Sequence, residues 1–290
     1  MSKSDAAVTA TTSIAAPLPP FSAEATIAGG SSIAVALPAD SFEEPQSPQS
    51  CISQFFGSQD SLNLQPKDFA IVYTGDTWHL FYIRHHQNTA YTAAVNERNL
   101  GHAVSIDLQN WSVVARNVLQ VQPGQWDNLH VWAPSIVLNP VDLKYYMLYT
   151  GVTQDTIKTP GPHFGQVLEV QRIGVATSLN LTSWSHENSW VYSQYQASWA
   201  QHDTTLEAGW QFRDPFVMPE PGAPGNYLMY YVAIDASLGR FVVGMARSTG
   251  NLHQWVDLGR LLKTNSLYVK TDVDTPRVES PHAFAHHGKW

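Results

Sequence analysis

The fold is decided by a stretch that runs from residue 212 to residue 255. It opens with Phe212-Arg213-Asp214-Pro215-Phe216-Val217-Met218, and a Pro/Gly turn leads to Asn226-Tyr227-Leu228-Met229-Tyr230-Tyr231-Val232. The run Val243-Gly244-Met245-Ala246-Arg247-Ser248 follows, and then Trp255. Short apolar runs that are rich in aromatic residues and bounded by turn residues are typical of strands. The stretch predicts a block of short strands with an acidic residue, Asp214, near the start of the first one.

The same order of signals recurs along the chain. Two earlier blocks each have an apolar opening run, an aromatic strand, a Gly-x-Ala-x-Ser run and a closing tryptophan. In the first block these lie at Pro66–Val72, Trp78–Ile83, Gly101–Ser105 and Trp111. In the second they lie at Val131–Leu138, Tyr145–Thr150, Ile173–Ser178 and Trp184. A fourth block opens at Val278–Phe284. Repeated units of three or four strands favour an all-β propeller over a β-sandwich.

We expect two parts in the chain. Residues 1–55 are rich in Ala, Ser, Thr and Pro and predict a low-complexity, disordered arm in which 32–37 could form a strand. Residues 56–290 predict the propeller domain, which would be incomplete at its C-terminus because the fourth block breaks off at Trp290.

Composition excludes several classes of function. The formal net charge is −8, and without clustered Lys and Arg this argues against a nucleic-acid partner. The sequence lacks a run of about 18 apolar residues, so we expect no membrane helix. The single cysteine, Cys51, excludes an internal disulfide framework. The N-terminal residues do not predict a signal peptide, and the localisation stays open between cytoplasmic and, with a missing signal, secreted.

The chemistry is expected where the first strand of each block begins, which we call the mouth position. Aligned in this way, the four blocks carry Asp68, Pro134, Asp214 and Glu279. The blades of a propeller are arranged radially, so equivalent residues should converge on one axial pocket. Crowded carboxylates raise the pKa of at least one member. An acid and a base would then lie side by side, as cleavage of a glycosidic bond requires.

The motifs Trp132-Ala133-Pro134, Lys144-Tyr145-Tyr146, Arg213-Asp214-Pro215 and Glu279-Ser280-Pro281 resemble a known family. They are similar to those of the five-bladed propeller glycoside hydrolases, especially glycoside hydrolase family 43, with the invertase and levansucrase families 32 and 68 as relatives. The resemblance implies a glycosidase that hydrolyses arabinofuranosides or xylosides of plant-type polysaccharides with inversion. It implies that Asp68 is the general base, that Asp214 tunes and orients the acid, and that Glu279 is the general acid.

Three further residues are candidates for substrate binding. Trp132 could stack on a sugar ring, although a tryptophan packed between blades is the alternative. His130 could hydrogen-bond to the substrate, and Arg213 could bind a substrate hydroxyl or form a structural salt bridge. The pairs His85-His86 and His286-His287 do not predict a metal site, because neighbouring residues on a strand point to opposite faces. We expect neither a metal nor a cofactor.

Other functions stay open beside the inverting hydrolase. One is a retaining enzyme that acts on fructans or sucrose. Another is a glycoside phosphorylase, for which basic groups would have to hold phosphate. The non-enzymatic alternative is a carbohydrate-binding propeller, in which the three carboxylates would not converge. In every case the expected partner is an oligo- or polysaccharide.

Overall fold

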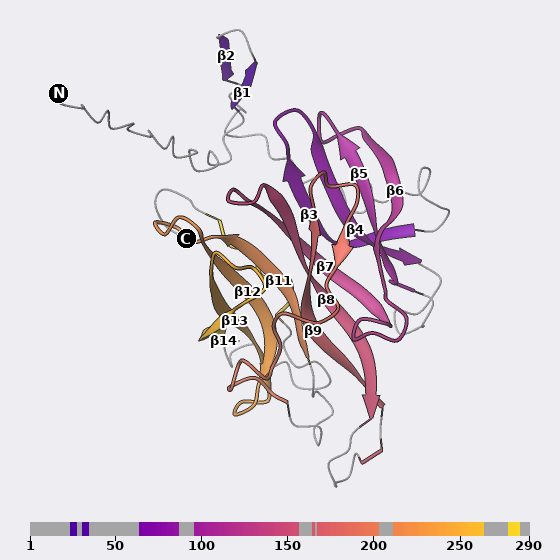
Figure 1. Ribbon diagram of the computed structural model, residues 1–290, viewed down its shortest axis with the longest axis vertical. Coiled ribbons are helices and arrows are strands. Elements are labelled where there is room, and N and C mark those ends of the chain that lie inside the picture. The colour runs from indigo at the N-terminus through magenta and orange to yellow at the C-terminus, as the bar shows by residue number, and fades with distance from the viewer. Residues whose placement is uncertain are drawn as a thin grey trace, which may run out of the picture. The chain divides into compact units, whose positions relative to one another are not determined.

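The computed structural model describes residues 24–27, 31–34, 64–86, 96–156, 164–165, 167–202, 211–263 and 278–284 (Figure 1). Every regular element in these ranges is a β-strand. None of these ranges contains a helix long and apolar enough to cross a membrane. The expected all-β class is confirmed.

The chain divides into two compact units, residues 1–45 with 283–290 and residues 46–282. The described part of the first unit includes the antiparallel strands β1 (Glu24–Ile27) and β2 (Ser31–Ala34), in which Glu24 pairs with Ala34. Strand β2 overlaps the strand suggested at 32–37, and residues 35–37 lie outside the described residues. The rest of the arm expected at residues 1–55 also lies outside them.

The second unit is built from three antiparallel sheets of four strands each, whose strands are adjacent in chain order. We call them blades 1 to 3. Their strands are β3 (Leu64–Tyr73), β4 (Trp78–His86), β5 (Asn99–Ser105) and β6 (Trp111–Gln120); β7 (His130–Asn139), β8 (Lys144–Thr156), β9 (Val167–Ser178) and β10 (Ser185–His186); and β11 (Phe212–Pro219), β12 (Asn226–Asp235), β13 (Arg240–Thr249) and β14 (Val256–Lys263). This up-and-down order is that of propeller blades. The described residues thus form three of the five blades that the resemblance implies.

The repeated tryptophan closes each blade through the same hydrogen bond. The indole nitrogens of Trp111, Trp184 and Trp255 donate to the carbonyl oxygens three residues earlier, at 3.1, 3.2 and 2.9 Å. In blades 1 and 2 the serine that ends the Gly-x-Ala-x-Ser run, Ser105 or Ser178, accepts a hydrogen bond from the turn backbone at 2.9 Å. The repeated residues therefore stabilise the turn before the last strand of the blade, in addition to their packing in the core.

The glycine of the same run makes room for a tyrosine. A Cβ atom on Gly101 would lie 2.4 Å from the ring of Tyr82, and one on Gly244 would lie 2.5 Å from the ring of Tyr231. In blade 2 the ring of Trp126 takes the corresponding place over Gly174, at 2.4 Å. A side chain larger than hydrogen would displace these buried rings, which explains why each block needs glycine there.

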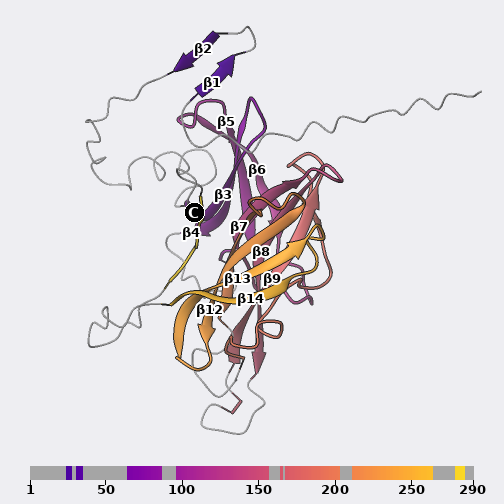
Figure 2. The same cartoon turned by 90° about the vertical axis from the view of Figure 1, so that its left-hand side faces the viewer.

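Adjacent blades pack face to face, and blade 2 lies between the other two (Figures 1 and 2). Met147 on β8 belongs to the core shared with blade 1, whereas its neighbour Leu148 belongs to the core shared with blade 3. Successive side chains of a strand point to opposite faces, so a strand buried on both faces must be apolar throughout. The innermost strand β7 contacts both β3 and β11. The first strands of the three blades therefore share one neighbourhood.

The strand expected at Val278–Phe284 is absent, because no part of these seven described residues is assigned to a strand. A strand requires backbone partners on a neighbouring strand. The backbone nitrogen of Ser280 instead donates to the side chain of Asp214, with an N–O distance of 3.1 Å. This segment enters the site described next as a loop.

Candidate active site

The first strand of each blade carries a β-bulge close to its start. The pairing passes from Lys67 directly to Phe69 in β3, from Trp132 to Ser135 in β7, and from Arg213 to Phe216 in β11. Each bulge adds one residue relative to the partner strand, which locally bends the strand and redirects a side chain. Asp68 and Asp214 are bulge residues, so both carboxylates leave the ladder at equivalent points.

A positive φ angle marks three of the positions that precede a proline. The φ angles of Ala133, Asp214 and Ser280 are 45°, 57° and 47°. Such a conformation costs a residue with a Cβ roughly 1–2 kcal/mol and is concentrated at functional sites. The shared geometry makes Ala133, Asp214 and Ser280 equivalent. The sequence alignment, which matched Pro134 and Glu279 to Asp214, was therefore off by one residue at both.

Ser280 joins two of the three expected carboxylates. Its hydroxyl donates to Asp68 Oδ1, with an O–O distance of 3.2 Å, and its backbone nitrogen donates to Asp214 Oδ2, with an N–O distance of 3.1 Å. The backbone nitrogen of Asp214 donates in turn to Thr150 Oγ1, at 3.0 Å. Farther along β11 the backbone nitrogen of Val217 donates to Ser135 Oγ at 2.9 Å. These two contacts hold β11 against blade 2.

Arg213 joins the third carboxylate to the same network. Its Nε atom lies 3.5 Å from Asp214 Oδ2, and its NH2 group lies 3.0 Å from Glu279 Oε1. The Arg213 guanidinium also lies 5.0 Å from the centre of the Phe241 ring and donates to the side chains of Gln171 and Gln211. Arg213 is thus a buried clamp between two acids. The structure brings Asp68, Asp214 and Glu279 together in one continuous polar network.

The three carboxylates differ in their surroundings. Asp214 is 4% exposed, and burial raises its pKa to about 6; the negative charges of Asp68 and Glu279 act in the same direction, against Arg213 and the Ser280 N–H. Loss of water around its carboxyl also raises the pKa of Asp68, although part of that residue faces solvent. The side chain of Glu279 is 55% exposed. The site therefore combines a buried carboxyl that titrates near neutral pH with two accessible ones.

Trp132 and His130 lie at the junction of blades 1 and 2. Trp132 is partly buried against the core of these blades, and the His130 ring stacks on it with centroids 5.0 Å apart. His130 is fully buried, and its Nδ1 donates to the backbone oxygen of Asn96 at 3.0 Å. Burial lowers the pKa of His130, which favours the neutral form of its ring. His130 offers no exposed surface to a ligand, whereas Trp132 is only partly buried.

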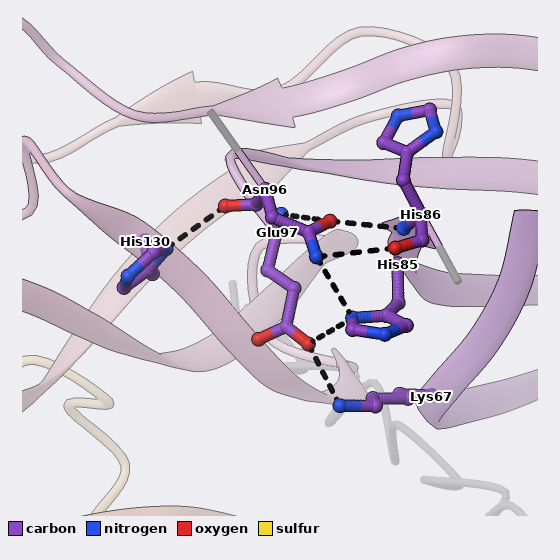
Figure 3. A network of polar contacts seen from close by, with 6 residues as sticks. All are labelled: Lys67, His85, His86, Asn96, Glu97 and His130. Carbon is purple, nitrogen blue, oxygen red and sulfur yellow. Dashed lines mark hydrogen bonds and ion pairs between the residues drawn. The ribbon is translucent and has the colours of Figure 1, made fainter. Parts of the chain in front are cut away.

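Sequence reasoning missed Ser280, Thr150 and Glu97. Ser280 could have been found, because it precedes a proline as Asp214 does. Thr150 could not have been found from the sequence, because its contact with Asp214 joins two blades and leaves no local pattern. Glu97 belongs to a second polar network, drawn in Figure 3, in which its carboxylate meets Lys67 and His85.

The described residues contain no group of three or more His, Cys, Asp or Glu side chains placed to hold a metal ion. His85 is hydrogen-bonded to Glu97, and the backbone nitrogen of His86 donates to Asn96 Oδ1. The pair His286-His287 lies outside the described residues. With two accessible carboxylates beside a buried acid and an arginine, the arrangement is suited to acid–base or nucleophilic chemistry at an acetal carbon.

The chain is similar in sequence or fold to several known proteins. A 79-residue segment, 27% of this chain, is 40% identical to the 6(G)-fructosyltransferase of Asparagus officinalis and spans 12% of that protein. In fold, the chain is similar to the inulosucrase from Halalkalicoccus jeotgali, with a TM-score of 0.52, 15% identity, and coverage of 70% of this chain and 54% of that one. The exo-inulinase from Aspergillus awamori has a TM-score of 0.49 and 20% identity, over 70% of this chain and 38% of its own.

The chain thus spans about half or less of the length of these relatives. The family described as "Glycosyl hydrolases family 32 N-terminal domain" matches residues 65–285. The propeller-glycosidase resemblance is therefore confirmed at the level of the wider group, whereas family 43 is not confirmed and its invertase-type relative fits better. Because the match covers most of the sequence, the chain belongs to glycosyl hydrolase family 32, in the part that forms its N-terminal domain.

Proposed function

We propose that this chain carries the catalytic centre of a retaining glycosidase or glycosyltransferase that acts on fructans or sucrose. The observation that carries the proposal is the network of Asp68, Asp214 and Glu279 through Ser280 and Arg213, in a chain of family 32. The names of the relatives, a fructosyltransferase and an inulosucrase, support fructosyl units as the group transferred. They favour the fructan-acting alternative over arabinofuranosides and xylosides.

In this reaction Asp68 is the nucleophile. Its carboxylate oxygen attacks the anomeric carbon of the fructosyl unit, and the bond from that carbon to the leaving oxygen breaks. Glu279 gives its proton to the leaving oxygen. Glu279 then takes a proton from water, or from the hydroxyl of an acceptor sugar, whose oxygen displaces Asp68. Two displacements at the same carbon retain its configuration.

Asp214 has a supporting role in this scheme. It is too buried and too firmly held by Arg213 and Ser280 to attack a substrate. A fixed carboxylate with a raised pKa is suited to accept hydrogen bonds from sugar hydroxyls and to bear on the ionisation of its neighbours. Arg213 would set the position of Glu279, to which it is bonded at 3.0 Å.

Trp132 is proposed as the apolar platform for the sugar. It holds the position in β7 that Arg213 holds in β11, one residue before the bulge residue with positive φ. His130 would act through Trp132, because it stacks on that ring and is itself fully buried.

The test is a substrate screen with the full chain. Sucrose, inulin-type and levan-type fructans are compared with aryl arabinofuranosides and xylosides, and ¹³C NMR of the anomeric carbon follows the configuration of the first product. We expect release or transfer of fructose with retention. Release of arabinose or xylose with inversion would restore the first interpretation, and phosphate-dependent turnover would indicate a phosphorylase. Binding of saccharide without turnover would indicate a carbohydrate-binding propeller.

A further inference from the structure

A buried ion-pair network lies behind Asp68 and has no part in the chemistry above. At its centre is Glu97, which is 4% exposed. Its Oε1 atom accepts a hydrogen bond from Lys67 Nζ at 2.9 Å and another from His85 Nδ1 at 2.7 Å (Figure 3). A buried carboxylate is stable only with such partners. The network therefore fixes the side chain of Lys67, the residue immediately before Asp68.

Glu97 is anchored to two blades at once. Its backbone oxygen accepts a hydrogen bond from the backbone nitrogen of Val131 in β7, at 3.2 Å. Its backbone nitrogen donates to Asn96 Oδ1 at 3.0 Å, and the same oxygen accepts from the backbone nitrogen of His86 in β4, at 2.9 Å. Glu97 also has a φ of 52°. A strained backbone persists only where its surroundings determine it strongly, which is a frequent property of functional sites.

The bulge of β3 begins at the residue that Glu97 holds. Lys67 pairs with Ile83 and Phe69 pairs with Tyr82, so Asp68 is the inserted residue that follows directly after Lys67. Movement of Lys67 would therefore alter the start of the bulge and the direction of the Asp68 side chain. An ion pair that served stability alone could lie anywhere between the blades, whereas this one adjoins the bulge.

The charges of the network also reach Asp68. Glu97 raises the pKa of Asp68 and Lys67 lowers it, in addition to the loss of water that is the main cause of its rise. From the other elements, Glu279 opposes the ionised form of Asp68, the Ser280 hydroxyl stabilises that form, and Asp214 is a further acid on β11. Glu97 and Lys67 thus shift the pKa of the Asp68 carboxyl in opposite directions.

We infer that Glu97 is a positioning residue for Asp68, which it controls by holding Lys67 at the start of the β3 bulge and by balancing the Lys67 charge. The inference rests on the proposed function in so far as Asp68 is the nucleophile. The geometric and electrostatic coupling itself can be tested without any substrate.

The experiment follows the carboxyl carbon of Asp68 by NMR in protein labelled with ¹³C at the aspartate carboxyls, with Asp68→Asn to assign the signal. In Glu97→Gln the titration midpoint of Asp68 is expected to move to lower pH by about 1 pH unit, because Lys67 is no longer neutralised. In Lys67→Met it is expected to move to higher pH. The matched control is Glu187→Gln, which removes an exposed ion pair with His253, at 3.2 Å, and should leave the midpoint unchanged.

Opposite shifts in the two variants support the inference, whereas no shift or parallel shifts would overturn it. Lys67→Met keeps the test decisive if Glu97→Gln does not fold, because the Lys67 side chain is 39% exposed. In turnover assays Glu97→Gln should lower kcat at least about tenfold with a smaller change in KM, and the acid limb of the pH profile should follow the NMR midpoint. Opposite NMR shifts in a protein without turnover would refute the proposed function and leave the coupling intact.

Discussion

The bulges of β7 and β11 have the same backbone geometry, but the side chains are apolar in β7 and ionisable in β11. Each carries one residue more than the partner strand, and each places a residue with positive φ before a proline. In β7 the two residues before the proline are Trp132 and Ala133, and in β11 they are Arg213 and Asp214. The bulge is therefore a backbone feature common to the blades, and the side chains at the bulge determine whether it brings a charged group into the site.

The surroundings of the two bulges match this difference. Trp132 packs with the core of blades 1 and 2 and stacks on the buried ring of His130. Asp214 accepts a hydrogen bond from the backbone nitrogen of Ser280 and lies beside Arg213, which also contacts Glu279. The bulge of β7 is thus mainly an apolar anchor, and that of β11 is an ionisable centre.

The largest effect is expected for Glu279→Gln. Glu279 precedes its positive-φ residue as Trp132 and Arg213 precede theirs, and it is the proposed proton donor. Loss of a general acid should lower kcat on sucrose or a fructan roughly 10²–10⁴-fold. Trp132→Phe, at the equivalent place in β7, should mainly raise KM. Unchanged kcat in Glu279→Gln would remove Glu279 from the mechanism.

The exchange Asp214→Ala gives β11 the Ala-Pro sequence of β7. Because Ala133 holds the same φ region, we expect the bulge to persist while kcat/KM falls roughly 10²–10³-fold, as for loss of one preorganised electrostatic contact. Ala133→Ser, which copies the Ser-Pro of Ser280, serves as the control and should change kcat/KM less than about tenfold. Circular dichroism and thermal unfolding would check the fold, and a non-cooperative transition would show that Asp214 holds the blade together instead.

The pH dependence of stability should differ between the two bulges. Asp214 has a folded-state pKa of about 6 against 3.8 for the unfolded chain, so between these values the folded state binds more protons. The tighter binding of this proton stabilises the folded state. This stabilisation is complete below the unfolded-state pKa and is lost as the pH rises through the folded-state pKa. From pH 4 to pH 7, Asp214→Asn should therefore gain about 2 kcal/mol of unfolding free energy relative to the wild type.

Denaturant unfolding at several pH values between 4 and 7 measures this change. Ala133→Ser adds no ionisable group to the β7 bulge, and its stability should follow the wild-type pH profile. A difference between Asp214→Asn and wild type that does not vary with pH would show that the Asp214 carboxyl titrates normally.

The smallest effect is expected for Ala133→Gly. Glycine adopts positive φ without the steric penalty of a Cβ, but it loses more backbone freedom on folding. The balance should stabilise the protein by up to about 1 kcal/mol. Ala115→Gly, on β6 and without a positive φ, should destabilise it by a similar amount. Destabilisation by Ala133→Gly would show that the alanine methyl packs usefully in the bulge.

Much of the fold followed from local patterns. The three blades, their closing tryptophans and the glycines beneath the tyrosines are repeated signals, and a repeated signal identifies a repeated unit. The register of the bulges did not follow. The sequence alignment matched Pro134 and Glu279 to Asp214, whereas the backbone angles match Ala133 and Ser280 to it. The difference is one residue in each case, and apolar periodicity cannot resolve one residue at a strand end.

The candidate site was predictable in its acids and in Arg213. Asp68, Asp214 and Glu279 stand out because they open their blocks. Ser280 and Thr150 connect parts of the chain that lie 66 and 64 residues from Asp214 in sequence, and such contacts leave no local pattern. Glu97 lies two residues before strand β5, where an acidic residue is unremarkable until its burial against Lys67 and His85 is seen.

Local sequence patterns are sufficient to predict the all-β blades and the residue types at the start of their first strands, because strand periodicity, turn glycines and closing tryptophans act over short distances. The tertiary structure alone decided which of those residues meet, which carboxyl is buried and which is accessible, and that Arg213 and Ser280 join them. The physical reason is that pKa values and hydrogen bonds in this site depend on desolvation and on charges from other blades, both of which exist only after the blades have packed.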